Sequence, residues 1–380
     1  MHNTYLSHSN IVSSYGFETT AAIDQIANEV SGLKLVDDSS ILPHPFYSSR
    51  IDHHLLEERY MRLNPLEKHT RLEKMFLVSL ADTIAKANIA LTDRVGLIIS
   101  TTKGNIDILN TNEFSENRVY LSELGKKITS FFNFKNDAIV LSNACVSGVL
   151  AIAIAKRFIR QQQYDHVFII GGDLVSEFIL SGFNSFQALS AEPCRPYCKT
   201  RTGINIGEVA TSILVTNDKS NLAKEAVTVL GESSCNDANH ISGPSRTGEG
   251  LHRSIEIAKK QAHLTAEDID FISAHGTATQ FNDEMEAIAF NRSGLEKTPI
   301  NSLKGYFGHT LGASGLLETI IGMHSLHQNT LFKSVGFQEM GVSKPLNIIE
   351  KTEKTEIKTF LKTASGFGGC NTAAIFQKVD

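Results

Sequence analysis

The chain has 380 residues, of which 41% are hydrophobic and 20% charged, so it can bury a large core as two units or as one large duplicated unit. A formal net charge of −5 argues against a general nucleic-acid binder. No run of about 18 uncharged apolar residues occurs, and no basic N-terminal region precedes an apolar one, so we expect a cytoplasmic protein with neither a membrane span nor a signal peptide.

Basic residues form two groups in the first part of the chain. One is spaced to share a face of the helix expected around Leu72, and the other follows on the helix after Cys145. The groups are Lys68, Arg71 and Lys74, and Lys156, Arg157 and Arg160. Each is either an ordinary solvated helix face or a docking site for an acidic partner.

Cys145 lies where an apolar run over residues 138–142 stops and a helix rich in small residues begins. The pattern predicts a thiol at a strand-to-helix elbow. A helix N-terminus favours thiolate over thiol, which is the state that a nucleophile needs. The alternative is a buried structural cysteine, since free cysteine is often buried.

The other cysteines do not indicate a disulfide framework or a metal site. Five cysteines is an odd number, and Cys194 and Cys198 have no second Cys or His pair at zinc-ligand spacing. We expect reduced cysteines and no metal.

The chain divides into two halves after a strand-like run that ends in polar residues at 216–220. The second half opens with an apolar run at 226–231 and continues through a loop at 242–245 to a helix around 251–263. We therefore predict two units, residues 1–218 with Cys145 and residues 219–380 with His275 and His309.

Two histidines in the second half lie in the same kind of context as Cys145. His275 follows the apolar run 269–273 in a glycine-containing turn, and His309 lies among glycines within residues 301–315. One cysteine and two histidines at the ends of strands or helices predict a nucleophile with its acid–base partners.

Four motifs in order resemble those of the β-ketoacyl synthases of the elongating, decarboxylative kind. The motifs are Ala144-Cys145-Val146-Ser147-Gly148, His275-Gly276-Thr277-Ala278-Thr279 with Asn282, Asp283 and Glu286, Lys304-Gly305 with Gly308-His309, and Gly366-Phe367-Gly368-Gly369 with Asn371. The resemblance covers nearly the whole chain. It implies an α/β chain with a thiolase-like, five-layered α-β-α-β-α fold built from two similar halves.

The resemblance also implies an acyltransferase that condenses an acyl group on Cys145 with a malonyl thioester, in fatty acid, polyketide or aryl polyene-type lipid biosynthesis. His275 and His309 would face the malonyl carbonyl. The backbone N–H groups of Cys145 and Phe367 would stabilise the oxyanion, and Gly368 belongs to the same gate.

Four further residues take supporting roles by the same resemblance. Thr277 and Thr279 would hold the pantetheine arm, although turn capping explains them equally well. Lys304 would give electrostatic support, with Glu318 as its structural partner. Asp283 belongs with them as a structural residue of the first histidine motif.

Partners follow from the family as well. Acyl chains would arrive on the phosphopantetheine of an acyl carrier protein, and no other cofactor is expected. The protein would form a homodimer, or a heterodimer with a related ketosynthase-like subunit.

The sequence departs from the family pattern in five places. Cys198 and Thr202 replace carboxylates in the loop that shapes the acyl pocket, Ser365 replaces an aromatic residue, and Cys370 replaces threonine after the double glycine. The chain also opens with residues 1–6 and lacks the apolar, valine-rich first strand ending in glycine that opens most relatives. These departures leave chain length, starter unit and choice of partner open.

Two other functions stay open. A non-catalytic, chain-length-determining partner subunit usually lacks the cysteine, whereas Cys145 is present here. An initiating synthase would carry asparagine in place of His309, and a thiolase would need a second active cysteine, for which Cys370 is the candidate.

Overall fold

The structure is a computed structural model that describes residues 3–379, for Asn110 the backbone alone. Its strands are β1 (Tyr5–Val12), β2 (Lys34–Val36), β3 (Phe46–Ser49), β4 (Val95–Ser100), β5 (Ile139–Leu141), β6 (His166–Asp173), β7 (Ile206–Gly207), β8 (Val209–Thr216), β9 (Val227–Asn236), β10 (Phe271–Ser273), β11 (Pro299–Asn301), β12 (Thr330–Leu331), β13 (Asn347–Ile348), β14 (Glu353–Lys354), β15 (Thr359–Gly366) and β16 (Cys370–Lys378).

The helices alternate with these strands along the chain. They are α1 (Thr19–Ala27), α2 (His53–Met61), α3 (Arg71–Ala87), α4 (Leu121–Phe132), α5 (Ser147–Arg160), α6 (Glu177–Ser185), α7 (Glu249–Ala262), α8 (Gln280–Arg292), α9 (Lys304–Phe307) and α10 (Ser314–Gln328), with 3₁₀ turns η1 (Ile106–Asn110), η2 (Glu116–Val119) and η3 (Leu311–Ala313). Within residues 3–379, no helix combines the length and apolar character needed to cross a membrane.

Eleven strands of the described chain form one sheet in the order β13-β11-β10-β15-β16-β9-β1-β8-β6-β4-β5. Counted outward from the short β1–β9 contact, each side begins with two antiparallel pairings, and parallel pairings follow. The two sides therefore repeat one pairing scheme. The predicted boundary after residue 218 falls between β8 and β9, and the division into two units stays a prediction.

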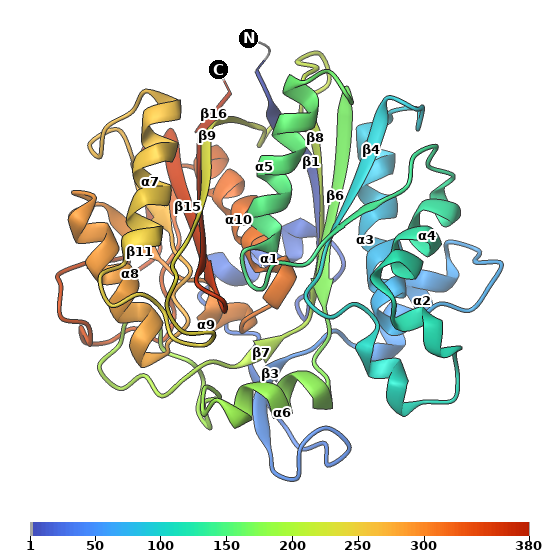
Figure 1. Cartoon of the computed structure of the whole chain (residues 1–380), viewed down its shortest axis with the longest axis horizontal. Coiled ribbons are helices and arrows are strands. Elements are labelled where there is room, and N and C mark those ends of the chain that lie inside the picture. Colours follow the sequence, from blue (N-terminus) through green and yellow to red (C-terminus); the bar gives the residue numbers. More distant parts are fainter. Residues whose placement is uncertain (1–2, 380) are drawn as a thin grey trace.

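Helices cover both sides of each half of the sheet (Figure 1). Helix α3 packs on β1, β6 and β8, and α7 packs on β9 and β16, at the two outer faces. Between the halves lie α5 and α10, which contact strands of both. The resulting order of layers, helix–sheet–helix–sheet–helix, confirms the five-layered architecture predicted from the sequence.

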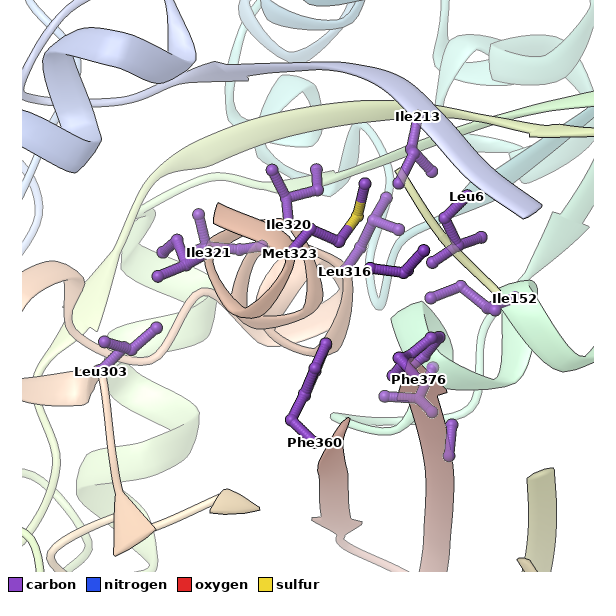
Figure 2. Packing of buried hydrophobic residues seen from close by; sticks show 14 of the residues in the cluster. Leu6, Ile152, Ile213, Leu303, Leu316, Ile320, Ile321, Met323, Phe360 and Phe376 are labelled. Carbon is purple, nitrogen blue, oxygen red and sulfur yellow. The ribbon is translucent and has the colours of Figure 1, made fainter. Parts of the chain in front are cut away.

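The burial of α10 explains its place between the halves. Its buried residues surround the whole helix, which is typical of a helix enclosed by the core rather than lying at its surface. Figure 2 shows Leu316 and Ile320 of α10 among side chains from both sheet halves and from α5, including Leu6, Ile213 and Phe376. Burial of this cluster holds the two halves together.

Strand β1 is an element that the sequence reasoning missed. Residues 5–12 form a strand near the middle of the sheet, paired with β8 on one side and with β9 on the other. Two of its polar side chains form hydrogen bonds there: Asn10 Nδ2 donates to Phe17 O at 3.0 Å, and Ser7 Oγ accepts from the Ala223 N–H at 2.8 Å. The expectation that the first strand is missing was wrong.

Four of the six residues in the two basic groups are paired with carboxylates. Lys68 precedes α3 and pairs with Glu113, while Arg71 pairs with the buried Glu208 at 2.7 Å. Lys74 forms an ion pair with Glu57 at 2.5 Å.

The second basic group is partly inside the protein. Lys156 is 5% exposed and pairs with the buried Glu232 at 2.6 Å, so it cannot meet a docking partner. Sequence spacing placed cations on a helix but could not show the carboxylates opposite them.

Gly207 in β7 forms a close contact that positions the segment around His309. Its N–H donates to His309 O at 3.1 Å, and a Cβ at this position would lie 1.7 Å from Phe307 O. We expect Gly207→Ala to lower the free energy of unfolding by about 1–3 kcal/mol in urea denaturation, because backbone must move.

The control is Gly182→Ala on α6, where a Cβ would meet nothing within 4 Å. This change should leave stability unaltered or raise it by up to about 1 kcal/mol, since alanine favours helix. Equal stabilities of the two variants would contradict the tight contact at Gly207.

Candidate active site

The strand-to-helix elbow at Cys145 has the predicted form. Strand β5 ends at Leu141, Ala144 takes a left-handed conformation with φ of 43°, and α5 begins at Ser147. Ser147 Oγ fastens the turn, because it accepts from the Asn143 N–H at 2.8 Å and donates to Ala144 O at 2.7 Å. The elbow thus holds Cys145 just before the first turn of α5.

Two carboxylates of α8 fix the turn that carries His275. Glu286 accepts from the backbone N–H groups of His275 and Gly276 at 2.9 and 2.7 Å. Asp283 accepts from the N–H of Thr277 at 3.0 Å and lies 3.7 Å from Arg201 Nε. The structural role predicted for Asp283 fits these contacts, and Glu286 acts beside it.

The hydrogen bonds of His309 determine which ring nitrogen carries the proton. Leu311 N–H points at Nδ1 at 3.2 Å, so Nδ1 accepts and the neutral ring has its proton on Nε2. Nε2 lies 2.9 Å from Cys145 Sγ. His309 therefore donates a hydrogen bond towards the sulfur.

Cys145, His275 and His309 come together in the folded chain. One side-chain donor atom of each lies within 4.8 Å of the others, and the two imidazole rings stand edge to face at 5.2 Å. The side chains are buried, with residue exposures of 8%, 2% and 2%. The cluster forms where the elbow of the first half meets β10 and α9 of the second.

Burial decides the charge states in this cluster. Desolvation raises the pKa of Cys145 to about 12, and the neighbouring Cys370 acts in the same direction. Desolvation lowers the pKa values of His275 and His309 well below the usual range, and repulsion from the positive charge of Lys304 is the second largest cause. The sequence expectation of a low-pKa thiolate was wrong, because it counted the helix N-terminus and not the burial.

A thiol with two imidazoles is also a donor set that zinc accepts. Two ligands of one tetrahedral zinc, however, stay about 3.5 Å apart. Cys145 Sγ and His309 Nε2 are closer, at 2.9 Å. Nε2 also carries the proton of the neutral ring, so its lone pair is not free to bind a metal. The spacing fits a hydrogen-bonded acid–base cluster.

Behind the histidines lies the predicted charged pair. Lys304 Nζ contacts Glu318 Oε1 at 2.5 Å and donates to His275 O at 2.9 Å. A second lysine, Lys362, pairs with the other oxygen of Glu318 at 2.6 Å. Sequence reasoning missed Lys362, because it lies on β15 outside every recognised motif.

The cluster opens into a cavity of about 370 Å³. Thr277 and Thr279 line it, and their hydroxyl groups share a hydrogen bond of 2.9 Å. Phe367 lines it as well and contacts the rings of Phe183 and Phe186, with centroids 5.7 and 5.3 Å away. These positions are compatible with the roles expected for the threonines and for Phe367, which stay predictions.

The glycine-rich loop packs directly against the elbow. A Cβ on Gly366 would lie 3.1 Å from Cys145 N, and Gly368 and Gly369 both have positive φ angles. Gly368 is not among the described residues that line the cavity.

The residues that depart from the family pattern lie in and around the same cavity. Thr202 and Ser365 line it. The hydroxyl of Thr202 shares a hydrogen bond with Ser190 Oγ, and the hydroxyl of Ser365 donates one to Asn371 Oδ1. Cys198 is buried outside it, where hydrogen bonds from Thr200 and nearby backbone outweigh desolvation and lower its pKa to about 7. Cys370 contacts Phe367 O at 3.4 Å.

His275 gives a stability prediction that depends on pH. Because the folded protein keeps this ring neutral, only the unfolded chain takes up a proton below its usual pKa of about 6.5. The histidine therefore lowers the free energy of unfolding on acidification, by up to about 1.4 kcal/mol per pH unit. We expect His275→Asn to lose less stability than wild type between about pH 7.5 and about pH 5.5 in urea denaturation.

The matched control is His44→Asn, since the side chain of His44 is exposed. That variant should keep the wild-type dependence on pH. A His275→Asn protein with the same dependence would show that the pKa of His275 is not lowered in the folded state.

Two family models cover most of the chain. Residues 46–221 match "Beta-ketoacyl synthase, N-terminal domain", and residues 226–338 match "Beta-ketoacyl synthase, C-terminal domain".

Similar curated proteins carry the same kind of description. A 3-oxoacyl-[acyl-carrier-protein] synthase 2 from Rhizobium meliloti is 32% identical over 251 residues, which are 62% of this chain and 59% of that protein. Its counterpart from Vibrio cholerae is 27% identical over 337 residues, 79% of this chain and 80% of that one. The chain thus spans about three fifths of the length of the Rhizobium relative.

Solved structures with the same fold superpose on this chain over its whole length. A chain of the ketosynthase–chain length factor complex from Xenorhabdus doucetiae superposes with a TM-score of 0.88 at 23% identity, covering 100% of this chain and 98% of that one. The ishigamide ketosynthase/chain length factor gives a TM-score of 0.89 at 22% identity, with 100% of each chain covered. These likenesses confirm the thiolase-like fold predicted from the sequence.

Proposed function

Because this chain belongs to the β-ketoacyl synthase family, we propose that it catalyses the decarboxylative condensation of an acyl group on Cys145 with malonyl-acyl carrier protein. The observation that carries the proposal is the convergence of Cys145, His275 and His309 at the cavity. A nucleophile and two hydrogen-bond donors around one site match the needs of this reaction.

The first half-reaction moves the acyl group. Cys145 sulfur attacks the thioester carbonyl of the acyl carrier, the new C–S bond forms, and the carrier thiolate leaves. The proton of Cys145 passes to that leaving thiolate, so the exchange is neutral overall. A thiol that is protonated at rest is therefore compatible with loading. The Cys145 and Phe367 N–H groups are the proposed donors to the oxyanion.

The second half-reaction uses the histidines. The bond between the malonyl carboxylate and its methylene carbon breaks, CO₂ leaves, and the electron pair forms an enolate on the thioester. His309 Nε2–H and the ring of His275 would donate hydrogen bonds to the enolate oxygen. The enolate carbon then attacks the acyl thioester, a C–C bond forms, and the C–S bond to Cys145 breaks. Cys145 leaves as a thiolate and takes up a proton from solvent, which restores the thiol for the next cycle.

Partners are proposed from the same family. Acyl and malonyl groups would arrive on the phosphopantetheine of an acyl carrier protein, with Thr277 and Thr279 along the arm, and no further cofactor is proposed. We propose that the condensation takes place in the cytoplasm.

A second subunit would pair at the edge of the sheet. Strand β5 is the edge strand on one side, and its side chains Ile139, Val140 and Leu141 are only half-buried. An apolar, half-open edge strand is suited to pairing with another subunit. Both a second copy of this chain and a related ketosynthase-like subunit fit this proposal.

The other candidate functions have less support. A non-catalytic, chain-length-determining subunit does not need the intact cysteine–histidine cluster. A thiolase would need a second reactive thiol in the cavity, and Cys370 is not among the described residues that line it.

The test is to incubate the purified protein with acyl- and malonyl-carrier protein and to determine the masses of protein and carrier. We expect an acyl adduct on Cys145 and a β-ketoacyl carrier. An unmodified protein together with unchanged malonyl carrier would contradict the proposed activity.

A further inference from the structure

Three consecutive backbone carbonyls at the end of β10 accept hydrogen bonds from two lysines. Lys362 Nζ donates to Ser273 O at 2.9 Å and to Ala274 O at 3.2 Å. Lys304 Nζ donates to His275 O at 2.9 Å. The whole segment that delivers His275 to the site is therefore held by ammonium groups.

The two lysines share one carboxylate. Glu318 on α10 contacts Lys304 through Oε1 and Lys362 through Oε2, at 2.5 and 2.6 Å. All three side chains are buried: Lys304 is 1% exposed, Lys362 0% and Glu318 2%. Both lysines therefore depend on this one buried carboxylate and on backbone carbonyls for their hydrogen-bonding partners.

The charged groups around Lys362 come from several elements. Glu318 of α10 and Glu286 of α8 face it as anions, and Lys304 of α9 faces it as a cation. Glu286 also accepts from the backbone of the His275 turn and from Tyr197 OH at 3.0 Å. Towards the site, the charge of Lys362 acts on His275 and on His309, and Nε2 of His309 contacts Cys145 Sγ.

The charge of Lys362 has the same effect on both histidines. Desolvation is the largest cause of their lowered pKa values, and repulsion from Lys304 and Lys362 lowers them further. A neutral imidazole N–H can donate to an enolate and keep its proton, whereas an imidazolium would hand the proton to the enolate and end the reaction.

We propose that Lys362 is a positioning residue for His275. Lys362 fixes the end of β10 by donating to two backbone carbonyls, and its buried positive charge keeps His275 and His309 neutral. The proposal deepens the condensation proposed above, on which its kinetic readout rests. Its spectroscopic readout is independent of that activity.

The experiment uses the full chain with Lys362→Gln and Lys362→Met. Glutamine can still donate to the carbonyls but carries no charge, and methionine removes both. The matched control is Lys156→Met, which removes another buried lysine that pairs with a glutamate, Glu232, and donates to a backbone carbonyl, Leu230 O. Lys156 lies eleven residues from Cys145, at the opposite end of α5.

Two quantities are measured against pH. One is the ¹⁵N chemical shift of the His275 ring, assigned by its loss in His275→Asn. The other is the rate of β-ketoacyl-carrier formation. Removal of a positive neighbour raises the pKa of His275, so we expect both titrations to move to higher pH by about one unit in Lys362→Gln and Lys362→Met, and neither to move in Lys156→Met.

Unchanged titrations in Lys362→Gln would overturn the proposal, even if that variant is less stable. If Lys362→Met does not fold, Lys362→Gln carries the test. If wild type forms no β-ketoacyl carrier, the proposed function fails, and the ¹⁵N titration still decides the role of Lys362.

Discussion

Cys145→Ala is expected to lose acyl loading by at least about 10³-fold, the scale seen when a covalent nucleophile is removed. The expectation rests on the position of the sulfur, which lies at the elbow before α5, 2.9 Å from His309 Nε2, and lines the cavity. The measurement is the mass of the intact protein after incubation with acyl-carrier protein. Wild type should gain the acyl mass, and the variant should not.

Two other thiols provide matched controls for this experiment. Cys370 is a neighbour of Cys145, and Cys194 is buried elsewhere with its Sγ 3.2 Å from Lys304 O. Cys370→Ala and Cys194→Ala should both retain acyl loading. Loss of loading in Cys370→Ala together with a persistent adduct in Cys145→Ala would move the nucleophile to Cys370.

His309→Asn is expected to retain acyl loading of Cys145 and to lose malonyl decarboxylation by about 10²–10³-fold. Loading depends on the thiol, whereas decarboxylation depends on donors to the enolate oxygen. Asparagine is shorter, so it cannot both accept from the Leu311 N–H and place a donor where Nε2 lies. Loading is followed by protein mass, and decarboxylation by release of CO₂ from malonyl-carrier protein.

The two activities should separate in a folded protein. Circular dichroism and urea denaturation verify that His309→Asn is folded. Equal losses of loading and decarboxylation in a folded His309→Asn protein would mean that the histidine activates the thiol instead.

The sequence determined those features that depend on local structure. An apolar run that meets a small-residue helix can only place Cys145 at an elbow, and the glycine-rich contexts of His275 and His309 place each histidine at the end of an element. The ordered motifs then identified the family, and with it the five-layered fold. Each elbow, turn and motif is defined by neighbours within a few residues.

Features that depend on distant neighbours were missed or wrongly predicted. Lys362 lies 89 residues from the Ser273 carbonyl that it holds, and Lys156 lies 76 residues from Glu232. Spacing along a helix shows where a cation lies but not which carboxylate faces it. The carboxylate partners of the first basic group and the polar strand β1 were missed for the same reason.

The sequence by itself placed the candidate residues at turns, caps and elbows, because these are set by adjacent residues. Only the tertiary structure decided how those residues are charged. Cys145 and His309 are separated by 164 positions and meet only after the two halves pack, and the same packing removes water from both. Desolvation outweighs the helix N-terminus, which is why the thiol has a raised pKa and the histidines stay neutral donors.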